Sequence, residues 1–231
     1  TVKLWNQDGK LLKTLYGHDD AVNWISFSPN GKFLASASDD NLVKLWTRDG
    51  KIIKDLIGHT SRVNGVAWSP NSDVLASVSL DSTVKLWNKN GQLKQTLMGY
   101  GDGLIGVNFS PDGKTLAVSS DSQIRLWSRE GVFLMALKGD EEDLTGVTFS
   151  PDGKILAAGS AKGNITLRSL SDKESGDVHM EQAGPEGALV LFSIYDSTGK
   201  GQLAQSLSSD GQVITTTTIE RIFKRLDSES A

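Results

Sequence analysis

The chain repeats itself with a period of about 41 residues. Tryptophan recurs at spacings of 41, 41 and 40 residues, and one glycine and one proline of each unit keep the same spacings. The markers are Trp5, Trp46, Trp87 and Trp127, then Gly17, Gly58, Gly99 and Gly139, then Pro29, Pro70, Pro111 and Pro151. A fixed period of this length is typical of arrays whose neighbouring units bury one another's apolar faces. Because three markers keep one phase, we predict such an array.

Each unit has the pattern of a small antiparallel sheet. In the unit 58–98, four runs rich in β-forming residues are separated by turn residues, at 62–69, 74–79, 83–88 and 92–98. The segment Ser110-Pro111-Asp112-Gly113 suits a tight turn, because proline fixes φ and glycine accepts a positive φ. We therefore predict four strands per unit.

Two units carry a combined motif that resembles the tryptophan-aspartate (WD) repeat of β-propellers. The first unit has Gly17-His18, Ser28-Pro29-Asn30-Gly31, Leu34 to Ser38, Asp40 and Val43 to Trp46, and the second has the matching Gly58-His59, Ser69-Pro70, Asp81 and Leu86-Trp87. The resemblance covers residues 1–170 and implies an all-β propeller of four-stranded antiparallel blades, with about five blades' worth of chain. Propellers have about four to eight blades, so a fragment of a larger ring and a small closed ring both stay open.

The resemblance also implies a buried hydrogen-bonded tetrad in each blade. By position the tetrads are His18, Ser36, Asp40 and Trp46, then His59, Ser77, Asp81 and Trp87. In the third unit Asp121 and Trp127 remain, while Tyr100 and Val118 replace the His and the Ser. The fourth unit has Asp140, Ala158, Lys162 and Arg168 at the four positions. Because each lost partner costs roughly 1–3 kcal/mol, we predict that stability falls from the first two units toward the C-terminus.

These patterns predict a division of the chain into blades. Residues 1–16 are expected to be the last two strands of an incomplete first blade, and 17–57 and 58–98 two WD blades. We expect a blade with a partial tetrad at 99–138, a blade without a tetrad at 139–170, a polar loop at 171–187, and a degenerate last blade with a C-terminal tail at 188–231. The turns after each Trp resemble those of bacterial, notably cyanobacterial, WD proteins. Because the chain opens on the third strand of a unit, we expect the C-terminal part of a larger protein.

The sequence predicts no enzyme and no cofactor. His, Ser and Asp recur with the period of the fold, as a buried tetrad does, whereas a catalytic triad occurs once and exposes its nucleophile. Gly113-Lys114-Thr115 lacks the upstream glycine of a phosphate loop. There is no cysteine, and two of the three histidines fall in tetrads, so we predict no metal site.

Composition excludes two classes of partner. The net charge is −4 with both signs interspersed, so no broad basic face for nucleic acid is expected. No apolar run approaches the roughly 20 residues of a membrane helix. The absence of cysteine and of an apolar leader fits a cytoplasmic location.

In propellers of this family, ligands meet the face built by the loops before the inner strands and the turns between second and third strands. On that face we expect a protein or peptide partner to contact Asp19, Asp20, Asp39, Ser61, Arg62, Leu80, Tyr100 and Asp102. Trp24 stands where later units have Gly65, Gly106 and Gly146, and is either a packing plug or a binding anchor.

The resulting hypothesis is a non-enzymatic interaction scaffold, or the sensor end of a bacterial signalling protein. The alternative is a propeller fragment that self-associates through open blade edges. A propeller hydrolase or lyase is the weakest hypothesis.

Overall fold

A computed structural model describes residues 1–98, 103–120, 122–138 and 144–170, together with four two-residue strands further along the chain. The chain divides into two compact units, Thr1–Leu170 and Ser171–Ala231. In the second unit β18 (Ile194–Tyr195) pairs with β19 (Gly201–Gln202), and β20 (Ser206–Leu207) pairs with β21 (Val213–Ile214). The predicted loop at 171–187 and the rest of the predicted last blade lie outside the described residues.

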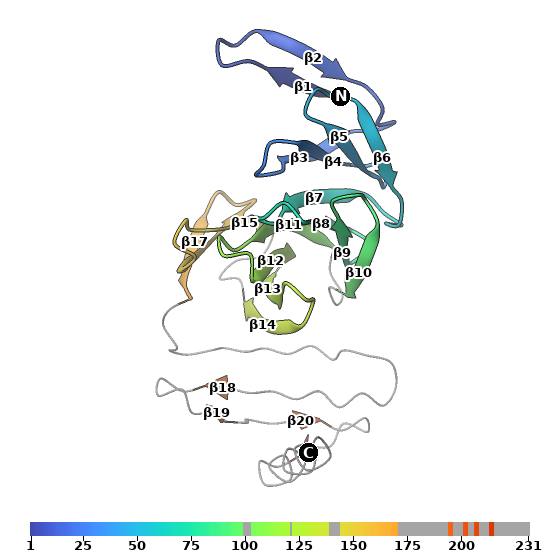
Figure 1. The fold of residues 1–231 in the computed structure, drawn as a ribbon. Helices are drawn as coiled ribbons and strands as arrows, with labels where there is room; N and C mark the ends of the chain where they lie inside the picture. The colour runs from blue at the N-terminus through green and yellow to red at the C-terminus, as the bar shows by residue number, and fades with distance from the viewer. Residues whose placement is uncertain are drawn as a thin grey trace. The chain divides into compact units, whose positions relative to one another are not determined.

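The compact unit Thr1–Leu170 is built from antiparallel sheets in series, and no helix occurs among the described residues (Figure 1). A hairpin of β1 (Val2–Trp5) and β2 (Leu11–Leu15) comes first. The first sheet contains β3 (Val22–Phe27), β4 (Phe33–Ser38), β5 (Val43–Thr47) and β6 (Ile52–Leu56). The second contains β7 (Val63–Trp68), β8 (Val74–Ser79), β9 (Thr83–Asn88) and β10 (Leu93–Met98). The third contains β11 (Leu104–Phe109), β12 (Thr115–Ser120), β13 (Gln123–Ser128) and β14 (Phe133–Lys138), and the fourth β15 (Leu144–Phe149), β16 (Ile155–Ser160) and β17 (Ile165–Ser169).

This architecture confirms the predicted all-β class, and the first three sheets have the predicted four strands, whereas three strands of the fourth sheet lie among the described residues. The four strands predicted within 58–98 agree with β7 to β10 to within one residue at each end. Within each sheet, every strand pairs with the strand that follows it in the sequence, so no strand order is crossed over. Within the described part of the first unit, the sheets do not close into a ring.

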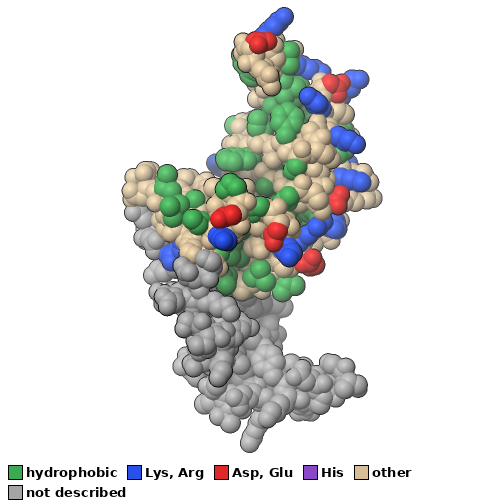
Figure 2. Space-filling model, turned by 60° about the vertical axis from the view of Figure 1, so that its left-hand side comes forward, with side chains coloured by type: hydrophobic (Ala, Val, Ile, Leu, Met, Phe, Trp, Pro, Cys, Tyr) green, Lys and Arg blue, Asp and Glu red, His purple; other side chains and the backbone are tan. Residues whose placement is uncertain are grey.

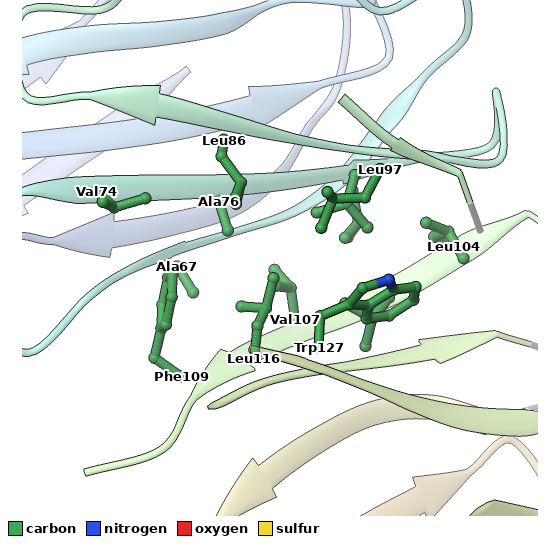
Figure 3. Close-up of a cluster of buried hydrophobic side chains, with 13 residues drawn as sticks. Ala67, Val74, Ala76, Leu86, Leu97, Leu104, Val107, Phe109, Leu116 and Trp127 are labelled. Atoms are coloured by element: carbon green, nitrogen blue, oxygen red, sulfur yellow. The ribbon is translucent and has the colours of Figure 1, made fainter. Parts of the chain in front are cut away.

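The apolar core lies between successive sheets. One cluster joins Ala67, Ala76 and Leu86 of the second sheet to Val107 and Leu116 of the third (Figure 3). Similar clusters join the first sheet to the second and the third to the fourth, and a smaller one joins the β1–β2 hairpin to the first sheet. Each sheet therefore depends on its neighbours for burial, as expected for stacked small sheets.

Two asparagines connect the sheets by hydrogen bonds that sequence reasoning missed. Asn23 Nδ2 donates to the carbonyl of Val63 at 3.0 Å, and Asn64 Nδ2 donates to the carbonyl of Leu104 at 2.7 Å. Both residues occupy the second position of an inner strand, and each reaches the first residue of the next inner strand. The third repeat has Ile105 at this position, and the isoleucine side chain has no hydrogen-bond donor.

Two turn glycines lie where neighbouring sheets pack closely. Gly50 and Gly91 have φ values of 75° and 70°, which favour glycine because it has no Cβ. A Cβ at Gly50 would overlap Leu15, and one at Gly91 would overlap Leu56. The outer strand of one unit therefore packs on the following unit's turn between its third and fourth strands.

The described residues contain no helix with the length and apolar character that crossing a bilayer requires.

Candidate functional site

The predicted residues of the first tetrad form a continuous chain of hydrogen bonds. Trp46 Nε1 lies 2.8 Å from Ser36 Oγ, Ser36 Oγ lies 2.7 Å from His18 Nε2, and His18 Nδ1 lies 2.7 Å from Asp40 Oδ2. An indole N–H only donates, so Ser36 accepts from Trp46 and donates its own proton to His18 Nε2. The imidazole therefore has its hydrogen on Nδ1 and donates it to the carboxylate of Asp40.

The second tetrad has the same arrangement. His59 lies 2.8 Å from both Asp81 Oδ2 and Ser77 Oγ, and Trp87 Nε1 donates to Ser77 Oγ at 2.9 Å. Thr83 adds a bond from its hydroxyl to Asp81 Oδ1 at 2.6 Å. Every polar atom in the chain of bonds has a partner, which is the condition for burying such groups without a large penalty.

The tetrad aspartates also bind the loops around them. Asp40 accepts the backbone N–H of Asp19 at 3.1 Å and that of Leu42 at 3.0 Å. In the second unit Asp81 accepts the backbone N–H groups of Thr60 and Thr83, both at 2.9 Å. Each carboxylate thus connects the loop before the inner strand to the turn between the second and third strands. These are the two loops that carry the predicted partner residues.

The environment favours a neutral imidazole beside an ionised carboxylate. Burial lowers the pKa of His18 and of His59, and the contacts with Asp40 and Asp81 offset this only in part. Burial acts to raise the pKa of Asp40, but hydrogen bonds from His18, Leu42 and Asp19 outweigh it, so the pKa lies below its usual value. The pKa of Asp81 is lowered in the same way, against burial, by Thr83, Thr60 and His59.

The serines of the tetrads are in no position to attack a substrate. Ser36 and Ser77 have no exposed surface, and the oxygen of each is engaged by both an indole and an imidazole. A nucleophile must reach its substrate, so this geometry favours a structural network. Among the described residues no group of three or more His, Asp or Glu side chains is placed to hold a metal ion.

The third and fourth units lack parts of the network. Val118, which is buried in β12, places methyl groups where Ser36 and Ser77 present hydroxyls, so Trp127 has no serine partner there. Ala158 takes the same position in β16. Asp121, Tyr100 and Asp140 lie outside the described residues, so the structure places none of their predicted contacts.

The predicted partner residues of the first two units lie on paired loops. Asp19, Asp20 and Arg62 are exposed, Asp39 and Ser61 are half-buried, and Leu80 is exposed. The backbone N–H of Asp39 donates to Ala21 at 2.9 Å, and the N–H of Leu80 donates to Arg62 at 3.1 Å. The same backbone bond therefore joins the two loops in both units. Tyr100 and Asp102 lie outside the described residues.

Trp24 is 52% exposed and belongs to none of the buried clusters of the described residues. At the equivalent Gly65, a Cβ would lie 3.1 Å from the Ile105 carbonyl oxygen, and at Gly106 it would lie 2.8 Å from Gly146 Cα. The later inner strands thus approach each other closely at this position. The 17–57 repeat instead has a large side chain there, with about half of its surface in solvent.

The fold and the tetrads agree with comparison to known proteins. The family model described as "WD domain, G-beta repeat" matches residues 9–47, 50–88, 91–128 and 131–168, which together exceed half of the chain. The chain belongs to the WD-repeat family. This confirms the resemblance found in the motifs.

Individual relatives match over single repeats. The nuclear distribution proteins nudF of Emericella nidulans and PAC1 of Tuber melanosporum are each 51% identical to this chain over 43 residues, 19% of the chain. The nuclear distribution protein PAC1 of Coccidioides posadasii is 50% identical over 40 residues. The matched segment spans only 8 to 10% of the length of these three relatives. All three are fungal, and the expected bacterial type stays a prediction.

Proposed function

We propose that this WD-repeat chain is a non-enzymatic scaffold that binds a protein or peptide on the loop face of its first two sheets. The loop face is defined here by Asp19, Asp20, Asp39 and Trp24 of the first unit, with Arg62, Ser61 and Leu80 of the second. The half-exposed indole of Trp24 carries the proposal. Tryptophan is enriched among residues that dominate binding energy at interfaces, and here it occupies a position that is glycine in the other three units.

The network beneath the loop face supports binding by limiting its motion. Asp40 and Asp81 hold both loops of their units through backbone N–H groups. Asp39 is further held by Asn23 Nδ2 at 2.7 Å. A surface that is ordered before binding loses less conformational entropy when a partner arrives.

The charges on the loop face indicate the kind of partner. Two exposed carboxylates, Asp19 and Asp20, precede the inner strand that carries Trp24. A partner segment with basic residues beside an apolar or cationic side chain would match the carboxylates and the indole together. Figure 2 draws one face of the molecule, on which positive and negative side chains of the described residues are mixed. A surface with mixed charge suits a protein partner better than nucleic acid.

The similarity to the nuclear distribution proteins spans about one repeat, so it supports the fold of a blade and says nothing of a partner. The proposed binding function therefore rests on the loops of this chain. We also propose a cytoplasmic location, and a degenerate last blade at 188–231. A sensor role within a larger bacterial signalling protein is the finer form of the same proposal.

The proposal is tested by selecting peptides from a displayed library for binding to the full 231-residue chain. We expect selected peptides to bind the wild-type chain and to lose about tenfold or more in affinity to Trp24→Ala, the loss that removal of a binding anchor produces. Trp5→Ala is the matched control, because Trp5 is 56% exposed and lies on the β1–β2 hairpin. Trp24→Ala should leave thermal melting nearly unchanged. A large loss of melting temperature in Trp24→Ala, or equal loss of binding in both variants, would contradict the proposal.

A further inference from the structure

The sequence contains three asparagine–glycine pairs in three different environments. Asn30–Gly31 and Asn90–Gly91 lie in tight turns, and Asn64–Gly65 lies within β7. An asparagine before a glycine is prone to a spontaneous reaction between its side-chain amide and the glycine nitrogen. Glycine favours this reaction because it has no Cβ to hinder the approach of its own nitrogen. The side chain must still be able to turn toward that nitrogen.

The two turn pairs have nearly the same backbone. Gly31 and Gly91 have φ values of 67° and 70°. The N–H of each donates to a carbonyl three residues earlier, Gly31 to Ser28 at 2.8 Å and Gly91 to Asn88 at 2.9 Å. Both asparagines are exposed. We therefore expect any difference in reactivity between the two turn pairs to come from the asparagine side chains.

The side chains of Asn30 and Asn64 are held by hydrogen bonds. Asn30 Oδ1 accepts the hydroxyl of Ser28 at 2.8 Å and the backbone N–H of Lys32 at 3.0 Å, and such local bonds fix an asparagine side chain in a turn. Asn64 Nδ2 donates to the Leu104 carbonyl at 2.7 Å. Either amide can turn toward the next nitrogen only after these bonds break.

The side chain of Asn90 has no such bond to any of the described residues. Its backbone N–H donates to Asn88 Oδ1 at 2.9 Å, but Asn88 Nδ2 donates to Gln92 Oε1 at 2.7 Å. The side chain of Asn88 is therefore engaged on both of its polar atoms and does not hold the amide of Asn90. That amide is exposed and can rotate toward the nitrogen of Gly91.

We propose that Asn90 is a site of spontaneous deamidation, at which the chain slowly gains one negative charge. The Gly91 nitrogen bonds to Asn90 Cγ, the Cγ–Nδ2 bond breaks, and the amide nitrogen leaves as ammonia with the proton of the glycine nitrogen. Water then opens the cyclic imide at either carbonyl. Cleavage of the new bond gives aspartate, and cleavage of the original peptide bond gives isoaspartate, whose side-chain carbon becomes part of the main chain.

The two products should affect the fold differently. Aspartate suits this turn, because the equivalent turns of the other repeats have Asp8, Asp49 and Glu130 at the same position. Isoaspartate lengthens the main chain directly before Gly91, which is buried and at which even an added Cβ would overlap Leu56. We expect isoaspartate to loosen the contact between the first and second sheets.

The test is an ageing experiment on the full 231-residue chain at neutral pH and body temperature. Peptide mapping by mass spectrometry measures conversion of all three asparagines in one sample, so Asn30 and Asn64 are internal controls. An isoaspartyl methyltransferase detects isoaspartate. A parallel sample in urea should convert the three sites at similar rates, because each is then an unfolded asparagine–glycine pair. Asn90→Gln is the matched variant, because it keeps an amide whose longer side chain cyclises far more slowly.

In the folded chain we expect Asn90 to convert about tenfold faster than Asn30 and Asn64, whose hydrogen bonds must break first. The isoaspartate fraction of aged wild type, separated by ion exchange, should have a lower urea midpoint than fresh protein, and aged Asn90→Gln should keep its midpoint. Equal conversion of the three sites in the folded chain would overturn the proposal. An Asn90 that stays intact while all three sites convert in urea would also overturn it. An unchanged midpoint of the isoaspartate fraction would contradict the loosened contact.

Discussion

At the residue scale, two buried networks determine how the first two units behave. Ser36 and Ser77 each accept an indole N–H and donate to an imidazole, so one hydroxyl satisfies two buried groups. The motif spacing predicted the members of these networks. It did not predict that Asp40 and Asp81 also accept the N–H groups of Asp19 and Thr60, because a backbone donor has no sequence signature.

Removal of either hydroxyl should lower the free energy of unfolding. Ser36→Ala and Ser77→Ala each leave a buried indole N–H and an imidazole nitrogen without a partner, which costs about 1–3 kcal/mol per unsatisfied group. Urea denaturation monitored by tryptophan fluorescence measures the loss. Ser61→Ala, a change in a loop outside the networks, should have little effect, and an equal loss in all three variants would show that the networks do not stabilise the fold.

The stability of the chain should fall as the pH falls below about 6.5, the ordinary pKa of histidine. His18 and His59 have lowered pKa values in the folded state. In this range the unfolded chain therefore binds more protons than the folded chain, which favours unfolding. Asp40 and Asp81, whose pKa values are also lowered, should add a further loss below about pH 4, where the unfolded carboxylates protonate.

Urea midpoints measured between pH 8 and pH 5 test this dependence. The double variant His18→Gln, His59→Gln should be less stable at pH 8 but should show a flatter dependence on pH between about 6.5 and 5. An unchanged slope in the double variant would assign the pH dependence to other groups.

At the element scale, the sequence predicted the strands well and the contacts between sheets poorly. Alternation and turn residues are local signals, and they placed β7 to β10 to within one residue. Asn23 and Asn64 act across a sheet boundary, at a carbonyl about 40 residues away. The signal for them was the recurrence of asparagine at one position in two units, and it is lost at Ile105.

Asn64→Ala should destabilise the contact between the second and third sheets. It removes a hydrogen bond from a half-buried amide to the Leu104 carbonyl, and such a bond contributes about 0.5–1.5 kcal/mol. Thermal and urea unfolding measure the effect, with Lys89→Ala in an exposed turn as the control. A stability equal to that of the control would show that apolar packing alone joins the sheets.

At the scale of the whole compact unit Thr1–Leu170, local stability should decline from the second sheet toward the fourth. The second sheet has a complete tetrad, an asparagine bond to the third, and a middle strand, β8, that is buried along its whole length. The fourth sheet has Ala158 in place of the serine, and along β17 no residue is fully buried. Local opening follows such differences in burial and hydrogen bonding.

Native-state amide hydrogen exchange tests this account most directly, because it reads the described sheets and their loops in one experiment. We predict the slowest exchange in β4, β5, β8 and β9, and the fastest among the strands of the first to fourth sheets in β15 to β17. The loop amides of Asp19 and Thr60, which donate to Asp40 and Asp81, should be protected far better than that of Arg62. Uniform protection across the four sheets, with Asp19 and Thr60 exchanging as fast as Arg62, would contradict the claim that the tetrads hold both the sheets and the loop face.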